Sequence, residues 1–144
     1  MWEDVGVAAC LSLAAVGSAL GTGYAAQGAV GSWKKCFIQN KAAPFLITVF
    51  VGFPLSQTIY GMVLMNKITG AAAAGHPLLG IGILGGLGMG ASAMMQGKAA
   101  AAACDSLAET GKGGINYIIA LGIIETVALF VMAFLLGKVD VFMA

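Results

Sequence analysis

One carboxylate lies inside an otherwise apolar segment of this chain. Glu125 follows residues 115–124, in which Asn116 and Tyr117 are the only polar side chains, and the apolar run continues through 127–136. A charged side chain at the centre of a membrane costs about 2.5–3.5 kcal/mol even on the mildest insertion scale, so we expect Glu125 to be functional. The alternative is a protonated glutamate that makes only a structural hydrogen bond between helices.

A neutral amide is predicted to lie at the same depth as this carboxylate. Gln96 lies nine residues before Asp105, where the connection to the last apolar segment begins, and Glu125 lies eleven residues after Gly114, where it ends. In an antiparallel helix pair these two positions face each other, because both lie about the same number of turns from the connection.

Further oxygen-bearing groups lie on the apolar segment 43–65. Gln57 is preceded by Ser56, and Tyr60 is about one helical turn further along. Pro54 removes the helical hydrogen bond to the carbonyl of Phe50 and is expected to kink the helix. The sequence therefore predicts free backbone oxygen close to Gln57.

These groups suit a cation site that is shielded from water. One carboxylate neutralises one sodium ion, and amide, hydroxyl and carbonyl groups supply the neutral oxygens that hard cations prefer. A proton would need only the carboxylate and one partner, so the additional oxygens favour sodium. A proton carried on Glu125 is the closest alternative.

The elements that must position these side chains are membrane helices. The chain has 144 residues, of which 60% are hydrophobic and 9% charged, against about 25% charged in soluble domains. A membrane span needs about 20 apolar residues, and four stretches qualify, at 5–31, 43–65, 78–104 and 115–136. We predict an all-α membrane protein with four transmembrane helices and no soluble domain. A net charge of +1 without a basic cluster gives no reason to expect nucleic acid as a partner.

The four segments are predicted to be two tandem copies of one helical hairpin. A shift of 69 residues pairs Gln27-Gly28 with Gln96-Gly97, and a shift of 68 pairs Gln57-Thr58 with Glu125-Thr126. We expect a first hairpin at 1–66, a short loop-like linker outside the membrane at 67–77, and a second hairpin at 78–144 that carries the ion-binding glutamate.

The first helix of each hairpin is rich in glycine at a spacing of four, and the second helix is bulkier. Small residues at this spacing let helices approach closely in lipid, which suits thin helices on the inner circle of a ring and thick helices on its outer wall. The alternative is a glycine zipper that holds together any helical bundle. The predicted packing residues are Gly17, Gly21, Gly28, Gly82, Gly86, Gly90 and Gly97.

Lysine positions predict the orientation in the membrane. Five lysines flank the first and third connections and two lie on the opposite side, so the hairpin loops are expected in the cytoplasm and both termini outside. The acidic start, Glu3-Asp4, predicts that the first apolar segment is a retained helix rather than a cleaved signal. The three cysteines match no metal or redox spacing and are expected to be buried as small apolar residues; they are Cys10, Cys36 and Cys104.

Three motifs in this order resemble the proteolipid of bacterial V-type ATPases. Residues 53–61, FPLSQTIYG, are similar to that family's Leu-Pro-x-Thr-Gln-x-x-Tyr-Gly stretch, with Ser56 in place of threonine. Residues 95–101, MQGKAAA, look like its Ala-Gln-Gly-Lys-x-Ala-Ala run, and Ile124-Glu125-Thr126 looks like its ion-carrying segment. Val127 and Leu55 stand where some members have tyrosine and glycine. The resemblance covers both hairpins.

The resemblance implies a sodium site and a role. The side chains of Glu125, Gln96, Gln57 and Ser56 would be ligands of Na⁺, the backbone carbonyl of Phe53 another, and Tyr60 would support Glu125 by a hydrogen bond. Copies of the chain would form a homo-oligomeric rotor ring in a bacterial plasma membrane. The ring would turn against a stator subunit that carries a buried arginine, and its cytoplasmic loops would contact a central-stalk subunit.

The chain is not expected to be an enzyme by itself or to hold a cofactor other than the transported ion. The segment 111–113, Gly-Lys-Gly, lacks the upstream glycine and the Ser/Thr of a phosphate-binding loop, so ATP would be hydrolysed by other subunits. Because only the second copy carries the carboxylate, each turn of such a ring would move few ions, which suits a pump better than a synthase.

Two alternatives belong to other classes. A small multidrug exporter also places one glutamate in a four-helix bundle, but on its first helix, whereas Glu125 lies on the fourth predicted helix. A purely structural four-helix membrane protein would tolerate Glu125→Gln without loss of activity.

Overall fold

The computed structural model describes residues 2–76 and 78–144, and every regular element in these ranges is helical. Four stretches in the described residues are long and apolar enough to cross a membrane, so the predicted all-α fold with four spans is confirmed. The elements are α1 (Trp2–Ile38), α2 (Leu46–Gly52), the 3₁₀ turn η1 (Phe53–Leu55), α3 (Ser56–Ala73), α4 (Leu79–Thr110) and α5 (Gly114–Met143).

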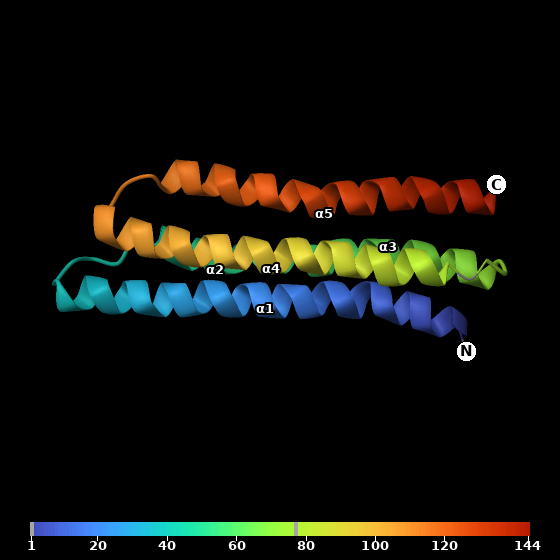
Figure 1. Ribbon diagram of the computed structural model, residues 1–144, viewed down its shortest axis with the longest axis horizontal. Coiled ribbons are helices and arrows are strands. Elements are labelled where there is room, and N and C mark those ends of the chain that lie inside the picture. Colours follow the sequence, from blue (N-terminus) through green and yellow to red (C-terminus); the bar gives the residue numbers. More distant parts are fainter. Residues whose placement is uncertain (1, 77) are drawn as a thin grey trace.

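The helices form an elongated bundle (Figure 1). In that view α4 lies between α1 and α5, and α2 and α3 lie behind α4. Both termini and the connection between α3 and α4 lie at one end of the bundle. The opposite end, here called the loop end, carries the connections 39–45 and 111–113. Consequently α1 and α4 run parallel to each other and antiparallel to α3 and α5.

Glycines bring the backbones of α1 and α4 into direct contact. A Cβ atom added to Gly17 would lie 2.1 Å from the carbonyl oxygen of Gly90, and one added to Gly97 would lie 1.9 Å from that of Gly21. Any side chain at these positions would force the two helices apart, because the obstructing atoms belong to backbone. All the glycines singled out from the sequence face the other helix of this pair: Gly17, Gly21, Gly28, Gly82, Gly86, Gly90 and Gly97.

The predicted loop-like linker at 67–77 is corrected by the structure, because α3 continues to Ala73. Ile68 and Ala71 are fully buried on this extension, and Lys67 forms an ion pair with Asp140 of α5. Alanine has the highest helix propensity, and these contacts give the extended helix a face to pack against. The connection is therefore 74–78, within which Pro77 lies outside the described residues.

The apolar core consists of two clusters with a polar layer between them. The cluster nearer the loop end contains Phe50 and Leu121, and the cluster nearer the termini contains Leu64 and Ala128. Along the chain, Gln57 lies between Phe50 and Leu64, and Glu125 lies between Leu121 and Ala128. Gln96 lies between the two clusters on α4. The three cysteines are buried in the two clusters and carry free thiols, as expected for small apolar residues.

Candidate ion-binding site

Two glutamine side chains lie at the centre of the polar layer. Gln57 on α3 and Gln96 on α4 are both 0% exposed, and Gln57 Nε2 donates a hydrogen bond of 2.9 Å to Gln96 Oε1. Burying an amide without a hydrogen-bond partner is costly. The two amides therefore satisfy each other in part, and together they join α3 to α4.

The carboxylate of Glu125 enters the same layer from α5. The hydroxyl of Tyr60 donates to Glu125 Oε1 at 2.7 Å, and Gln96 Nε2 lies 3.4 Å from Glu125 Oε2. Tyr60 is one turn beyond Gln57 on α3, so both side chains approach α5 from one helix. The Tyr60–Glu125 hydrogen bond is the one that the family resemblance implied, and Glu125 itself is half-buried.

Further oxygen atoms lie close together in the second span, where the 3₁₀ turn η1 separates α2 from α3. Pro54 lies in η1, where a short 3₁₀ turn interrupts the α-helix. Ser56 Oγ lies 3.2 Å from the carbonyl oxygen of Phe53 and 3.2 Å from Gln57 Oε1. The hydroxyl, the backbone carbonyl and the amide oxygen therefore form one cluster at the start of α3.

The structure brings all six residues singled out from the sequence into one polar cluster, in which the single Ser56 O–H can donate either to the Phe53 carbonyl or to Gln57 Oε1. The contacts run, in order, through Phe53, Ser56, Gln57, Gln96, Glu125 and Tyr60. The oxygens come from a carboxylate, amides, hydroxyls and a backbone carbonyl, which is the donor set that a hard cation prefers.

The negative charge of Glu125 has no basic partner among the described residues. The ion pairs found there join Lys35 to Asp105 and Glu109, and Lys67 to Asp140, all at the ends of the helices. A carboxylate shielded from water needs a compensating charge, and a bound cation or a proton would supply it. The charge and the donor set thus suit a single monovalent cation.

The structure adds residues to this site that sequence reasoning missed. Ser92 Oγ on α4 donates to the carbonyl oxygen of Ile124 at 2.9 Å, and Gln96 Nε2 donates to that of Leu121 at 2.9 Å. The position of Ser92, one turn before Gln96, was the available signal, since residues four apart share a helix face. The acceptors are backbone carbonyls, which every residue has, so the residue types do not indicate them.

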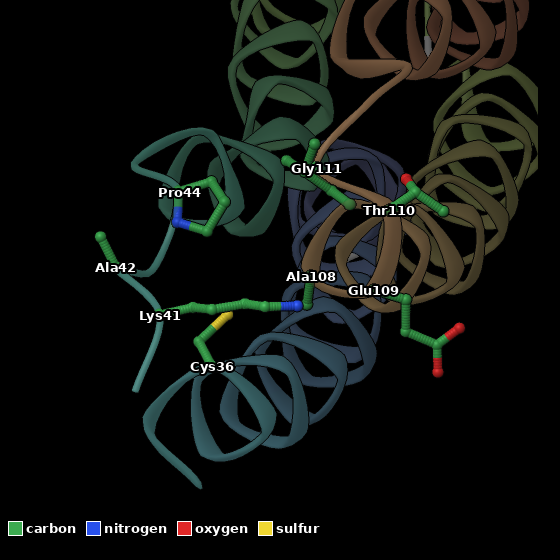
Figure 2. A pocket seen from close by; sticks show the side chains of 9 residues that line it. Cys36, Lys41, Ala42, Pro44, Ala108, Glu109, Thr110 and Gly111 are labelled. Atoms are coloured by element: carbon green, nitrogen blue, oxygen red, sulfur yellow. The ribbon is translucent and has the colours of Figure 1, made fainter. Parts of the chain in front are cut away.

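A pocket of about 260 Å³ lies at the loop end and is separate from the polar layer (Figure 2). Lys41 reaches across it from the 39–45 connection towards Ala108, near the end of α4 where a cation complements the helix dipole. Glu125 is eleven residues into α5, which is roughly 16 Å along the helix axis. The lining residues are Cys36, Lys41, Ala42, Pro44, Leu107, Ala108, Glu109, Thr110 and Gly111.

A comparison with known protein families finds a similarity in the second hairpin. Residues 79–136, about two fifths of the chain, match the family model of the ATP synthase C-subunit. The match includes Ser92, Gln96 and Glu125, and it contains all of α4 and most of α5. A comparison with curated proteins gave no significant match.

The matched family consists of membrane proteolipids that form oligomeric rings in rotary ATPases. With four apolar spans, the chain is a multi-pass integral membrane protein. Its second hairpin, which carries Glu125, is similar to the non-catalytic rotor subunit through which rotary ATPases move ions across the membrane.

Proposed function

We propose that this chain is the rotor-ring subunit of a V-type, sodium-translocating ATPase and that it carries one Na⁺ on Glu125. The observation that carries the proposal is the buried polar layer, in which one carboxylate without a basic partner among the described residues is linked to Gln57, Gln96 and Ser56. A proton needs far fewer partners than this layer supplies. Sodium uses them, since it requires several oxygens to replace its hydration shell.

The loaded site can pass through the lipid because the complex of the ion with Glu125 is electrically neutral. Sodium and one carboxylate together carry no net charge, so a copy of the chain can face lipid while the ring turns. Where a copy meets the buried arginine of the stator, the guanidinium competes for Glu125 and releases the ion. ATP hydrolysis in other subunits turns the ring in a bacterial plasma membrane.

The loop end of the bundle is assigned to the cytoplasm, where it contacts the central-stalk subunit. Lys35 pairs there with the exposed Asp105 and Glu109, and the Lys41 pocket lies beside them. Lysine is more frequent at this end than at the other, which agrees with the positive-inside rule. Both termini then lie outside the cytoplasm.

The two copies of the hairpin differ in a way that favours pumping. The first copy has Gln57 where the second has Glu125, and its counterpart of Gln96, Gln27, is exposed on α1. Each chain therefore carries one ion per four helices. Fewer ions per turn let each ATP drive an ion against a larger gradient.

Carbodiimide modification of Glu125 in purified rings tests the proposal. The reagent attacks protonated carboxyl groups, so bound sodium should protect Glu125 at a fixed pH. The protected fraction would be measured by mass spectrometry over a sodium titration, with potassium at equal ionic strength as the control. Glu125→Gln should abolish the modification, and Glu109→Gln should leave it unchanged, because Glu109 is exposed at the loop end.

Protection by sodium at millimolar or lower concentration would support the sodium rotor. Rapid modification that is independent of sodium would make the proton the transported ion. The absence of any modification under all conditions would contradict an ion-carrying role for Glu125.

A further inference from the structure

Apolar packing does little to fix the rotation of α5 about its own axis. Only three of its 30 residues are buried, namely Leu121, Ala128 and Val139, and the other apolar side chains that pack against the core are only partly buried. The helix nevertheless carries the single carboxylate of the polar layer. Hydrophobic contact is non-directional, and this narrow stripe would allow α5 to turn by a fraction of its circumference. Directional contacts are needed to keep Glu125 aimed at Tyr60.

Two side chains of α4 supply such contacts. Ser92 Oγ donates to the carbonyl oxygen of Ile124, and Gln96 Nε2 donates to that of Leu121, each at 2.9 Å. The two acceptors are three residues apart and therefore lie on the same face of α5. In the α-helix the Leu121 carbonyl also accepts the N–H of the residue four positions later, which is Glu125. Both bonds thus hold the turn of backbone that immediately precedes the carboxylate.

The internal repeat provides a comparison within the same chain. A shift of 69 residues places Gly23 at the position of Ser92 and Gln27 at the position of Gln96. Gly23 has no side chain to donate a hydrogen bond, and Gln27 is exposed. The pair of donors therefore occurs in the hairpin that carries the carboxylate and has no counterpart in the hairpin that lacks it.

Ser92 is the member of this pair whose role can be isolated. Gln96 also touches Gln57 and Glu125, so replacing it would disturb the site directly. Ser92 is 6% exposed and its hydroxyl reaches the backbone of α5 without touching the carboxylate. Any effect of Ser92 on Glu125 must pass through the position of α5.

We propose that Ser92 is a positioning residue that holds α5 in the rotation at which Glu125 faces the polar layer, and that its bond to Ile124 breaks when Glu125 turns outward to exchange its ion. The inference rests on the proposed ion-carrying function. An interaction changes the affinity for an ion only if it differs between the bound and the open states. A merely structural hydrogen bond, present in both states, would leave the affinity unchanged.

The test compares Ser92→Ala with Thr126→Ala in purified rings. Thr126 is next to Glu125, but its hydroxyl bonds only within α5, to the carbonyl oxygen of Ile123, so it controls for the loss of a hydroxyl near the site. Two quantities are measured at fixed pH. They are the sodium concentration that half-protects Glu125 against carbodiimide, and the rate of modification without sodium.

Ser92→Ala is expected to raise the half-protecting sodium concentration roughly three- to tenfold, from the usual strength of hydrogen bonds between membrane helices. It should also accelerate modification without sodium, while Thr126→Ala changes either quantity less than twofold. Intact rings of Ser92→Ala with wild-type values for both would overturn the inference. If Ser92→Ala does not assemble, Ser92→Cys, similar in size and a weak donor, should change both quantities in the same direction, and wild-type values there would also overturn it.

The two proposals can fail separately. If sodium does not protect the wild type, sodium transport is wrong, but the rate of modification without sodium still tests Ser92. A faster rate in Ser92→Ala would then support the positioning role in a proton-carrying rotor, and an equal rate would refute it.

Discussion

Replacing Tyr60 with phenylalanine removes one oxygen atom from the polar layer and leaves the aromatic ring in place. The lost hydroxyl is the donor to Glu125 Oε1, at 2.7 Å. Tyr60 is half-buried, so the ring should stay where it packs beside Leu64 and the cluster around it. The substitution therefore tests one hydrogen bond with little change in packing.

The size of the effect follows from the geometry. A hydrogen bond to a charged group contributes about 1.5–3 kcal/mol. The lower end applies here, because Gln96 still approaches the other carboxylate oxygen and Tyr60 is not fully shielded from its surroundings. Because the proposed exchange turns Glu125 outward and breaks this bond, a loss of about 1.5 kcal/mol falls on the ion-bound state alone and corresponds to a roughly tenfold weaker affinity for sodium. We therefore expect Tyr60→Phe to raise the half-protecting sodium concentration about tenfold.

The measurement is the sodium titration of carbodiimide modification at fixed pH. Tyr117→Phe is the matched control, since it makes the same chemical change near the start of α5, where the Tyr117 hydroxyl pairs with Ser106 instead of the site. Tyr117→Phe should match the wild type. If Tyr60→Phe rings also titrate like the wild type, the hydrogen bond contributes nothing to ion binding and the assignment of Tyr60 is wrong.

Two further substitutions test the ligands and the helix packing. Gln57→Leu deprives Gln96 Oε1 of its donor and removes an amide oxygen. Sodium protection of Glu125 should therefore weaken at least about tenfold, whereas modification of Glu125 without sodium should persist. Unchanged sodium protection would count against Gln57 as a ligand. Gly90→Leu would place its Cβ atom 2.5 Å from the carbonyl oxygen of Leu13 and should abolish intact rings in detergent gels. Gly31→Leu is the control, because a Cβ atom there has no such neighbour, and it should preserve the rings. Intact rings of Gly90→Leu would refute the close α1–α4 contact.

The sequence alone was enough to predict the four spans and which polar residues lie within them. Hydropathy over about 20 residues is a local property, and the position of Glu125 within its apolar segment needs no knowledge of its neighbours in space. Gln96 does approach Glu125, but the predicted turn is corrected by the structure: α4 runs to Thr110 instead of ending near Asp105, so the two residues are not equally far from the turn. The loop-like structure expected for 67–77 was wrong, because local residue types do not reveal the contacts that a helix makes in space. Lys67 and Gly70 suggest a loop locally, whereas the contacts of α3 with α5 extend the helix to Ala73.

Only the tertiary structure decided how the polar groups are joined. The sequence placed Ser56, Gln57 and Tyr60 on one segment, but the hydrogen bonds to Gln96 and Glu125 depend on the rotation of three helices about their axes. The contacts of Ser92 with α5 depend on the same rotations, and their backbone acceptors could not be identified from residue types. Helix rotation is set by contacts between residues far apart in the chain, such as Gly17 against Gly90. Composition and spacing therefore identify the groups that can bind an ion, and the packing of the helices determines which of them meet.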